Sequence, residues 1–130
     1  MYSVVIFISV PTVPAPQSVT LTSSDNVGIS GSSITLNCTV ELDPSVIWES
    51  ELSLLIVEAQ LSRNGTPLTM LSLSGPTVTG TTFTFGAEVS SFNESDVGNY
   101  TCLATVTPQA SSTYLTGTRQ LQSSPLEISK

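Results

Sequence analysis

The sequence predicts an all-β fold, either a sandwich or a barrel of antiparallel strands. About seven or eight short segments alternate apolar and polar residues, and turns rich in Ser, Gly, Pro and Asn separate them. No stretch of the chain repeats apolar residues at the i, i+3, i+4, i+7 spacing of an amphipathic helix. The 130 residues suit one domain with one core and are too few for two ordinary domains.

The expected strands follow one another from residue 17 onward. They cover residues 17–23, 33–42, 53–62, 67–74, 77–79, 82–89 and 98–107, and a last one lies within residues 117–129. The alternation is clearest at 33–42, where every second residue from Ile34 to Leu42 is apolar. The strands at 82–89 and 98–107 alternate in the same way, so each of these strands has one buried face.

The strand at 53–62 leads into a turn that is typical of a hairpin. Its inward residues are expected to be Val57, Ala59 and Leu61. The pair that follows, Asn64-Gly65, is the one that two-residue hairpin turns favour, because both positions need a positive φ.

The two cysteines, Cys38 and Cys102, lie on the inward sides of their strands. Joined, they would close a loop that stabilises the fold by about 4 kcal/mol. The alternative is two buried free thiols. The chain has no His, so these cysteines cannot complete a structural zinc site of four Cys and His ligands.

Three segments resemble motifs of the immunoglobulin superfamily. DVGNYTC at residues 96–102 resembles the D-x-G-x-Y-x-C pattern around the family's second cysteine. GSSITLNC at 31–38 resembles G-x-x-x-T-L-x-C, and LSRNGTPL at 61–68 resembles W-x-K-N-G-x-x-L. The resemblance implies an immunoglobulin-like Greek-key β-sandwich of two antiparallel sheets, with one disulfide between the sheets that joins Cys38 to Cys102. It also implies a tyrosine corner formed by Tyr100 and Asp96.

The chain departs from the family pattern in two places. Leu61 stands where the third strand carries the family's core Trp, so either Leu61 takes that position or Trp48 does, with a shorter third strand. We favour Leu61, because Asn64-Gly65 then makes a proper hairpin. No Lys or Arg lies between residues 71 and 94, so the Arg that variable-type domains pair with the Asp is missing, and an intermediate-type domain fits better.

The first 16 residues differ in composition from the rest. Residues 2–10, YSVVIFISV, are rich in Val and Ile, which favours a strand, and are too short to cross a bilayer as a helix. They lack the basic leader region and cleavage site of a signal peptide. Residues 11–16, PTVPAP, have the composition of a stiff linker. We expect residues 1–16 to be an N-terminal strand and linker, and residues 17–130 to form the immunoglobulin-like domain.

Four N-x-[ST] sequons occur, at Asn37, Asn64, Asn93 and Asn99. The alternation turns Asn37 and Asn99 outward, Asn64 lies at the hairpin tip, and Asn93 lies in a loop. We expect N-glycans most at Asn64 and Asn93, and least at Asn37, because its sequon includes Cys38. The alternative is that these residues are polar turn residues without glycans.

Composition excludes several function classes. Three Lys and Arg against ten Asp and Glu give a net charge of −7, so we expect no nucleic acid partner and no direct membrane contact from this domain. Without His no nucleophile has its usual base, and we expect neither an enzyme nor a cofactor. The carboxylates near one loop lack the spacing of a calcium loop, so we expect no metal there; they are Glu41, Asp43, Glu49 and Glu51.

The resemblance implies a recognition module: an extracellular domain of a cell-surface receptor or adhesion protein that binds a protein ligand or itself. Ser and Thr make up 40 of the 130 residues, and this charge-poor style resembles domains of early-branching animals, such as a sponge-type receptor tyrosine kinase ectodomain. The binding candidates are Trp48 and Tyr114, in loops that the family places at one end of the sandwich. The alternative for Trp48 is that it folds back and caps the core of the sandwich. The alternatives are a structural spacer in a multidomain ectodomain and a carbohydrate-binding sandwich module.

Overall fold

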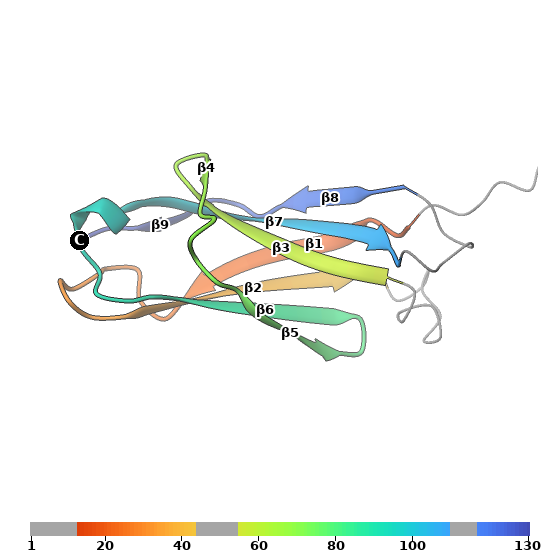
Figure 1. Cartoon of the computed structure of the whole chain (residues 1–130), viewed down its shortest axis with the longest axis horizontal. Helices are drawn as coiled ribbons and strands as arrows, with labels where there is room; N and C mark the ends of the chain where they lie inside the picture. Colours follow the sequence, from red (N-terminus) through yellow and green to blue (C-terminus); the bar gives the residue numbers. More distant parts are fainter. Residues whose placement is uncertain (1–12, 44–54, 110–116) are drawn as a thin grey trace, which may run out of the picture.

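The computed structural model describes residues 13–43, 55–109 and 117–130. In these residues two antiparallel sheets pack face to face, with the strands along the long axis of the molecule (Figure 1). The first sheet has the order β1-β2-β6-β5; in the second the order is β4-β3-β7-β8, and β9 also pairs with β7. The fold class predicted from the sequence, an immunoglobulin-like Greek-key sandwich of two antiparallel sheets, is confirmed.

The strand bounds agree with the expected segments for most of the chain. They are β1 (Pro16–Ser23), β2 (Ile34–Leu42), β3 (Leu55–Arg63), β4 (Thr66–Pro67), β5 (Ser74–Thr79), β6 (Thr82–Val89), β7 (Gly98–Pro108), β8 (Arg119–Gln122) and β9 (Leu126–Ile128). A 3₁₀ turn, η2 (Glu94–Asp96), precedes β7. Asn93 caps this turn: its side-chain oxygen accepts from the Ser95 backbone amide, and its own backbone amide donates to the Asp96 carboxylate.

The core lies between the sheets and follows the alternation of the central strands. Every second residue of β2, from Ile34 to Leu42, is buried, and β6 and β7 repeat this pattern. The core residues come from both sheets and from the loops at their ends: Val13, Leu21, Ile34, Leu36, Cys38, Val40, Leu42, Leu55, Val57, Leu61, Phe83, Phe85, Ala87, Val89, Phe92, Tyr100, Cys102, Ala104, Val106 and Ile128.

The prediction of a strand at residues 67–74 is wrong. β4 ends at Pro67 and β5 begins at Ser74, so residues 68–73 cross from one sheet to the other outside any strand, and only the Leu68 amide still donates to β3, to the Leu61 carbonyl at 2.8 Å. Leu68 and Leu71 pack against the core three positions apart, and the Leu71 amide donates to the Leu68 carbonyl at 3.2 Å. This spacing makes a turn rather than a pleat, and it turns Met70 into solvent with 96% of its surface exposed.

The last expected strand is broken in two. Ser123 lies between β8 and β9, and it is buried. Its backbone amide donates to the Cys102 carbonyl at 2.8 Å, and its hydroxyl accepts from the Cys102 amide at 2.9 Å. The Ser123 hydroxyl thus takes the place of a ladder carbonyl, and Pro125 follows without an amide hydrogen to donate.

The packed domain includes Val13, which is 1% exposed and belongs to the core. It falls in the segment expected to be a linker, three residues before β1 begins at Pro16, so at least this residue of the segment packs against the domain. The separate strand expected at residues 2–10 lies outside the described residues and stays a prediction.

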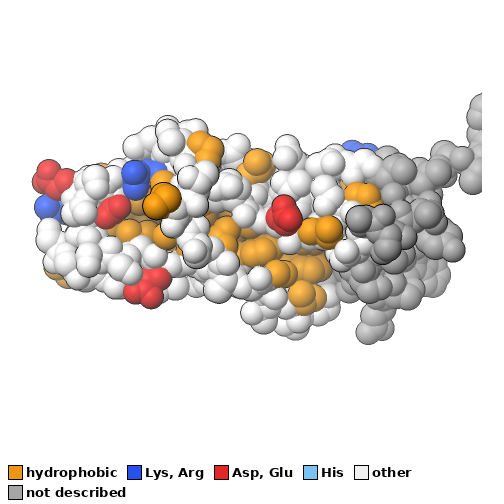
Figure 2. Space-filling model, in the orientation of Figure 1, with side chains coloured by type: hydrophobic (Ala, Val, Ile, Leu, Met, Phe, Trp, Pro, Cys, Tyr) orange, Lys and Arg blue, Asp and Glu red, His pale blue; other side chains and the backbone are white. Residues whose placement is uncertain are grey.

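The surface of the described residues is largely uncharged. Figure 2 shows few Asp, Glu, Lys or Arg side chains, and hydrophobic side chains appear along the opening between the two sheets. Strands β1, β2, β5 and β6 contain no Lys or Arg. No helix in the described part of the chain is long and apolar enough to span a bilayer.

Candidate functional site

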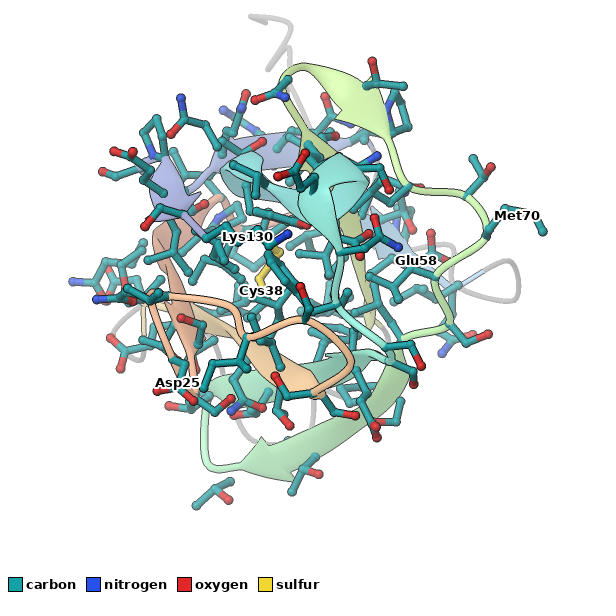
Figure 3. The ribbon with its side chains drawn as sticks, turned by 90° about the vertical axis from the view of Figure 1, so that its left-hand side faces the viewer. Asp25, Cys38, Glu58, Met70 and Lys130 are labelled. Carbon is teal, nitrogen blue, oxygen red and sulfur yellow. A yellow bond between two sulfur atoms is a disulfide. The ribbon has the colours of Figure 1, made fainter. Side chains whose placement is uncertain are left out.

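A disulfide joins the two sheets at the centre of the core. Cys38 of β2 and Cys102 of β7 are bonded, with their Cα atoms 6.3 Å apart, and they are 1% and 0% exposed. Viewed from the end of the sandwich where Lys130 lies, the bond sits in the middle of the section (Figure 3). The prediction of an inter-sheet disulfide is confirmed, and the alternative of two free thiols is excluded.

Leu61 occupies the core position beside this disulfide. It pairs directly with Cys102 across β3 and β7, and only 1% of its surface is exposed. The strand β3 runs through Leu61 to a two-residue turn at Asn64 and Gly65, both with positive φ (52° and 83°). The alignment that gives Leu61 the core position is therefore the one adopted. Trp48 lies outside the described residues.

A buried tyrosine near the start of β7 is hydrogen-bonded to the turn η2 that precedes this strand. The Tyr100 side chain is fully buried, and its hydroxyl donates to the backbone carbonyl of Asp96. Burial raises the pKa of the Tyr100 phenol above its usual value of 10.0, because the phenolate would be poorly solvated there. The nearby Arg63 guanidinium opposes this rise.

Arg63 also forms an ion pair with Asp96 that the sequence did not predict. Its Nη1 lies 3.5 Å from Asp96 Oδ1, and both side chains are partly buried. The Arg of variable-type domains is expected between residues 71 and 94, where this chain has none. Here the cation comes from the end of β3 instead, 33 positions before Asp96.

Two of the four sequons meet at the β3–β4 hairpin. The Asn64 side-chain oxygen accepts from the Asn99 amide at 2.9 Å, and the Asn64 amide donates to the Asn99 carbonyl at 2.8 Å. Gly98 makes this contact possible because it has no side chain: a Cβ there would lie 2.7 Å from the side-chain nitrogen of Asn64. Its φ of +156° is also one that other residues rarely adopt. Asn64 and Asn99 are both exposed, so the hairpin brings two candidate glycan sites side by side.

The other two sequons lie on separate faces. Asn93 is exposed at the start of η2, and its side-chain oxygen is engaged by Ser95, the third residue of its sequon. Asn37 is exposed on the outer face of the first sheet, where it pairs with Gly86 of β6. Glycosylation of all four asparagines stays a prediction.

The end of β2, the start of β3 and the end of β7 lie at one end of the sandwich (Figure 1). β2 ends at Leu42 and β3 begins at Leu55, so residues 44–54 connect them; β7 ends at Pro108, ahead of residues 110–116. Leu55 pairs directly with Pro108. Tyr114 and Trp48, the binding candidates, belong to these two segments and lie outside the described residues.

A groove that the sequence did not predict lies near Arg63, at the opposite end of β3 from Leu55. Its volume is about 570 Å³, and it lies beside the Arg63–Asp96 pair and Tyr100, with Leu68 and Met70 on its apolar side. Figure 3 shows Met70 directed away from the domain. Arg63 and Asp96 pair with each other, and Glu88, which also lines the groove, adds a further carboxylate.

Of the four carboxylates expected near one loop, Glu41 and Asp43 are among the described residues. No group of three or more His, Cys, Asp or Glu side chains suited to a metal occurs among residues 13–43, 55–109 and 117–130. Glu41 accepts a hydrogen bond from Ser18 at 3.3 Å, and Glu49 and Glu51 lie outside the described residues.

Comparison with protein families adds one finding. The family model described as "Immunoglobulin domain" matches residues 25–114, more than half of the chain. The match spans both cysteines, Tyr100 and the Asn64-Gly65 hairpin. No curated protein is similar enough to count as a relative.

Proposed function

We propose that this chain, which belongs to the immunoglobulin domain family, acts as an extracellular domain of a cell-surface receptor or adhesion protein. The observation that carries the proposal is the buried disulfide at the centre of the core. Such a bond forms and persists in oxidising compartments and is rare in the cytosol. Domains of this family commonly act in protein recognition, so the proposed activity is the binding of a protein ligand or of a second copy.

The recognition site is assigned to the end of the sandwich that carries residues 44–54 and 110–116. The pairing of Leu55 with Pro108 supports this assignment, because it brings the two segments to neighbouring strands. Trp48 and Tyr114 are the aromatic residues of these segments. Aromatic side chains dominate the energy of many protein interfaces, since they bury a large area at little cost in conformational entropy.

Self-recognition is tested by sedimentation of the oxidised, glycosylated chain over a series of concentrations, with and without residues 1–11. A dimer that survives this deletion, and that is lost when Trp48→Ala and Tyr114→Ala are combined, supports self-recognition through the proposed end. A dimer that needs residues 1–11 comes from pairing of the apolar N-terminal segment and contradicts self-recognition. If every sample is monomeric, self-recognition is excluded, and the proposed ligand is a different protein.

A further inference from the structure

The outer face of the first sheet holds a polar depression with a volume of about 410 Å³. Its lining comes from β2, from β6 and from the start of β5 and the residues before it: Thr35, Asn37, Ser72, Ser74, Gly86, Ala87 and Glu88. Many side chains around it on this face carry hydroxyls. One row of paired residues across the sheet consists of Thr20, Thr39, Thr84 and Thr77.

Gly86 opens the floor of this depression. It sits in the interior of β6, between Asn37 on one side and Ser74 on the other. It is not among the residues with positive φ, so the backbone does not require glycine at this position. A glycine inside a strand costs about 0.5–1 kcal/mol relative to alanine, and it often marks a place where a ligand approaches the backbone closely.

The side chain of Asn37 reaches over this floor. Its amide oxygen lies 3.5 Å from the place where a Gly86 Cβ would stand, and the Ser74 hydroxyl oxygen lies 3.3 Å from the same point. Asn37 is exposed, and Thr39, the third residue of its sequon, is two positions along the strand and on the same face. The amide nitrogen that a glycan would modify is therefore at the rim of the depression.

We propose that the depression seats the first sugar of an N-linked glycan carried by Asn37. This inference rests on the proposed extracellular function, because the glycan is added in the secretory pathway. In that addition the C1–O bond between sugar and a polyprenyl diphosphate donor breaks, and a C1–Nδ2 bond forms on Asn37. The amide nitrogen loses one proton, and the polyprenyl diphosphate leaves.

The lining suits a sugar ring. The Ser74 hydroxyl donates to the Gly86 carbonyl at 3.1 Å, so it and the Glu88 carboxylate can accept hydrogen bonds from the sugar's hydroxyl and acetamido N–H groups. The Ser72 hydroxyl can donate to the sugar or accept from it. The bare Cα of Gly86 lets one face of the ring lie close to the sheet. No cation from β1, β2, β5 or β6 is available for an acidic ligand, which agrees with a neutral one.

The test uses the chain secreted by animal cells, with glycan occupancy at each sequon measured by peptide mapping. Release of the Asn37 glycan by a peptide N-glycosidase is timed on the native protein and on the urea-unfolded protein. At each site, the release rate from the unfolded protein divided by the rate from the native protein gives the protection of the glycan. We expect the protection at Asn37 to exceed that at Asn93 about fivefold, the factor that about one net hydrogen bond supplies.

Gly86→Thr fills the floor and should remove this extra protection. Gly86→Ala, whose Cβ needs only a small shift of the Ser74 side chain, should remove part of it and serves if the threonine variant folds poorly. The matched control is Thr84→Val, on the same strand and face but outside the depression, and it should keep the protection.

Equal release rates in the wild type and both Gly86 variants would overturn the inference. So would a bare Asn37 in a chain whose other sequons carry glycans. The recognition function has a different readout, the binding that Trp48 and Tyr114 are proposed to support, so each proposal can fail while the other holds.

Discussion

Breaking the disulfide is the perturbation whose cost follows most directly from the fold. Cys38 and Cys102 are 64 positions apart, so their bond closes a loop that spans half of the chain. A loop of this length removes about 14 cal/mol/K of entropy from the unfolded chain, which is about 4 kcal/mol at 25 °C. Domains of this size have a total free energy of unfolding of about 5–15 kcal/mol, so the bond supplies a large part of it.

The assay is urea unfolding followed by far-ultraviolet circular dichroism, for the oxidised wild type and for the variant with Cys38→Ala and Cys102→Ala. With a urea dependence of about 2 kcal/mol/M, the expected loss lowers the midpoint by about 2 M. The small cavities left by two buried sulfur atoms add to the loss.

The control is a reducing agent. It should lower the midpoint of the wild type by a similar amount and leave the double alanine variant unchanged. Midpoints for the oxidised and reduced wild type that agree to within about 0.3 M would refute the reasoning, because the cross-link would then contribute less than about 1 kcal/mol.

Three other predictions concern the core and its edges. Tyr100→Phe should lower the free energy of unfolding by about 1–2 kcal/mol through the lost hydrogen bond to Asp96. Because burial raises the pKa of Tyr100, the wild type should also lose stability as pH rises above 10.0, where the unfolded chain ionises first; a Phe variant that loses as much between pH 9 and about 11 would contradict this. Leu61→Ala should cost about 2–5 kcal/mol in urea unfolding, and a loss below about 1 kcal/mol would show that Leu61 does not fill the core. Gly28→Ala should lower the melting temperature, because a Cβ at Gly28 would lie 2.1 Å from the Phe92 ring; an unchanged melting temperature would mean that the ring moves freely.

The parts of the fold that alternation controls were predictable from the sequence. β2, β6 and β7 each have one face in the core and one in solvent, so their apolar residues recur at every second position. The Asn64-Gly65 turn carries its own signal, since two consecutive positive φ angles favour this pair. Together these elements fix the length of β3 and place Leu61 opposite Cys102.

Other features depend on contacts between distant residues and leave little trace in a local pattern. Residues 68–73 look apolar enough for a strand, but Leu68 and Leu71 contact the core from a turn. Arg63 could not be assigned to Asp96 from sequence, because the sheet brings it there from 33 positions away. The depression at Gly86 could not be predicted from the sequence for a related reason. It lies among polar residues, where no alternation of apolar residues distinguishes one position from the next.

The central claim is recognition through the end of the sandwich that carries Trp48 and Tyr114. It is tested most directly by fluorescent tetramers of the secreted domain, whose binding to live cells of the organism that encodes it is measured by flow cytometry. The account predicts saturable binding by the wild type and by Met70→Ser, the control that removes an exposed apolar side chain elsewhere. It predicts at least a tenfold loss of affinity, about 1.4 kcal/mol, for the variant with Trp48→Ala and Tyr114→Ala. Equal binding by the two variants, or no saturable binding by the wild type to these cells, would contradict it.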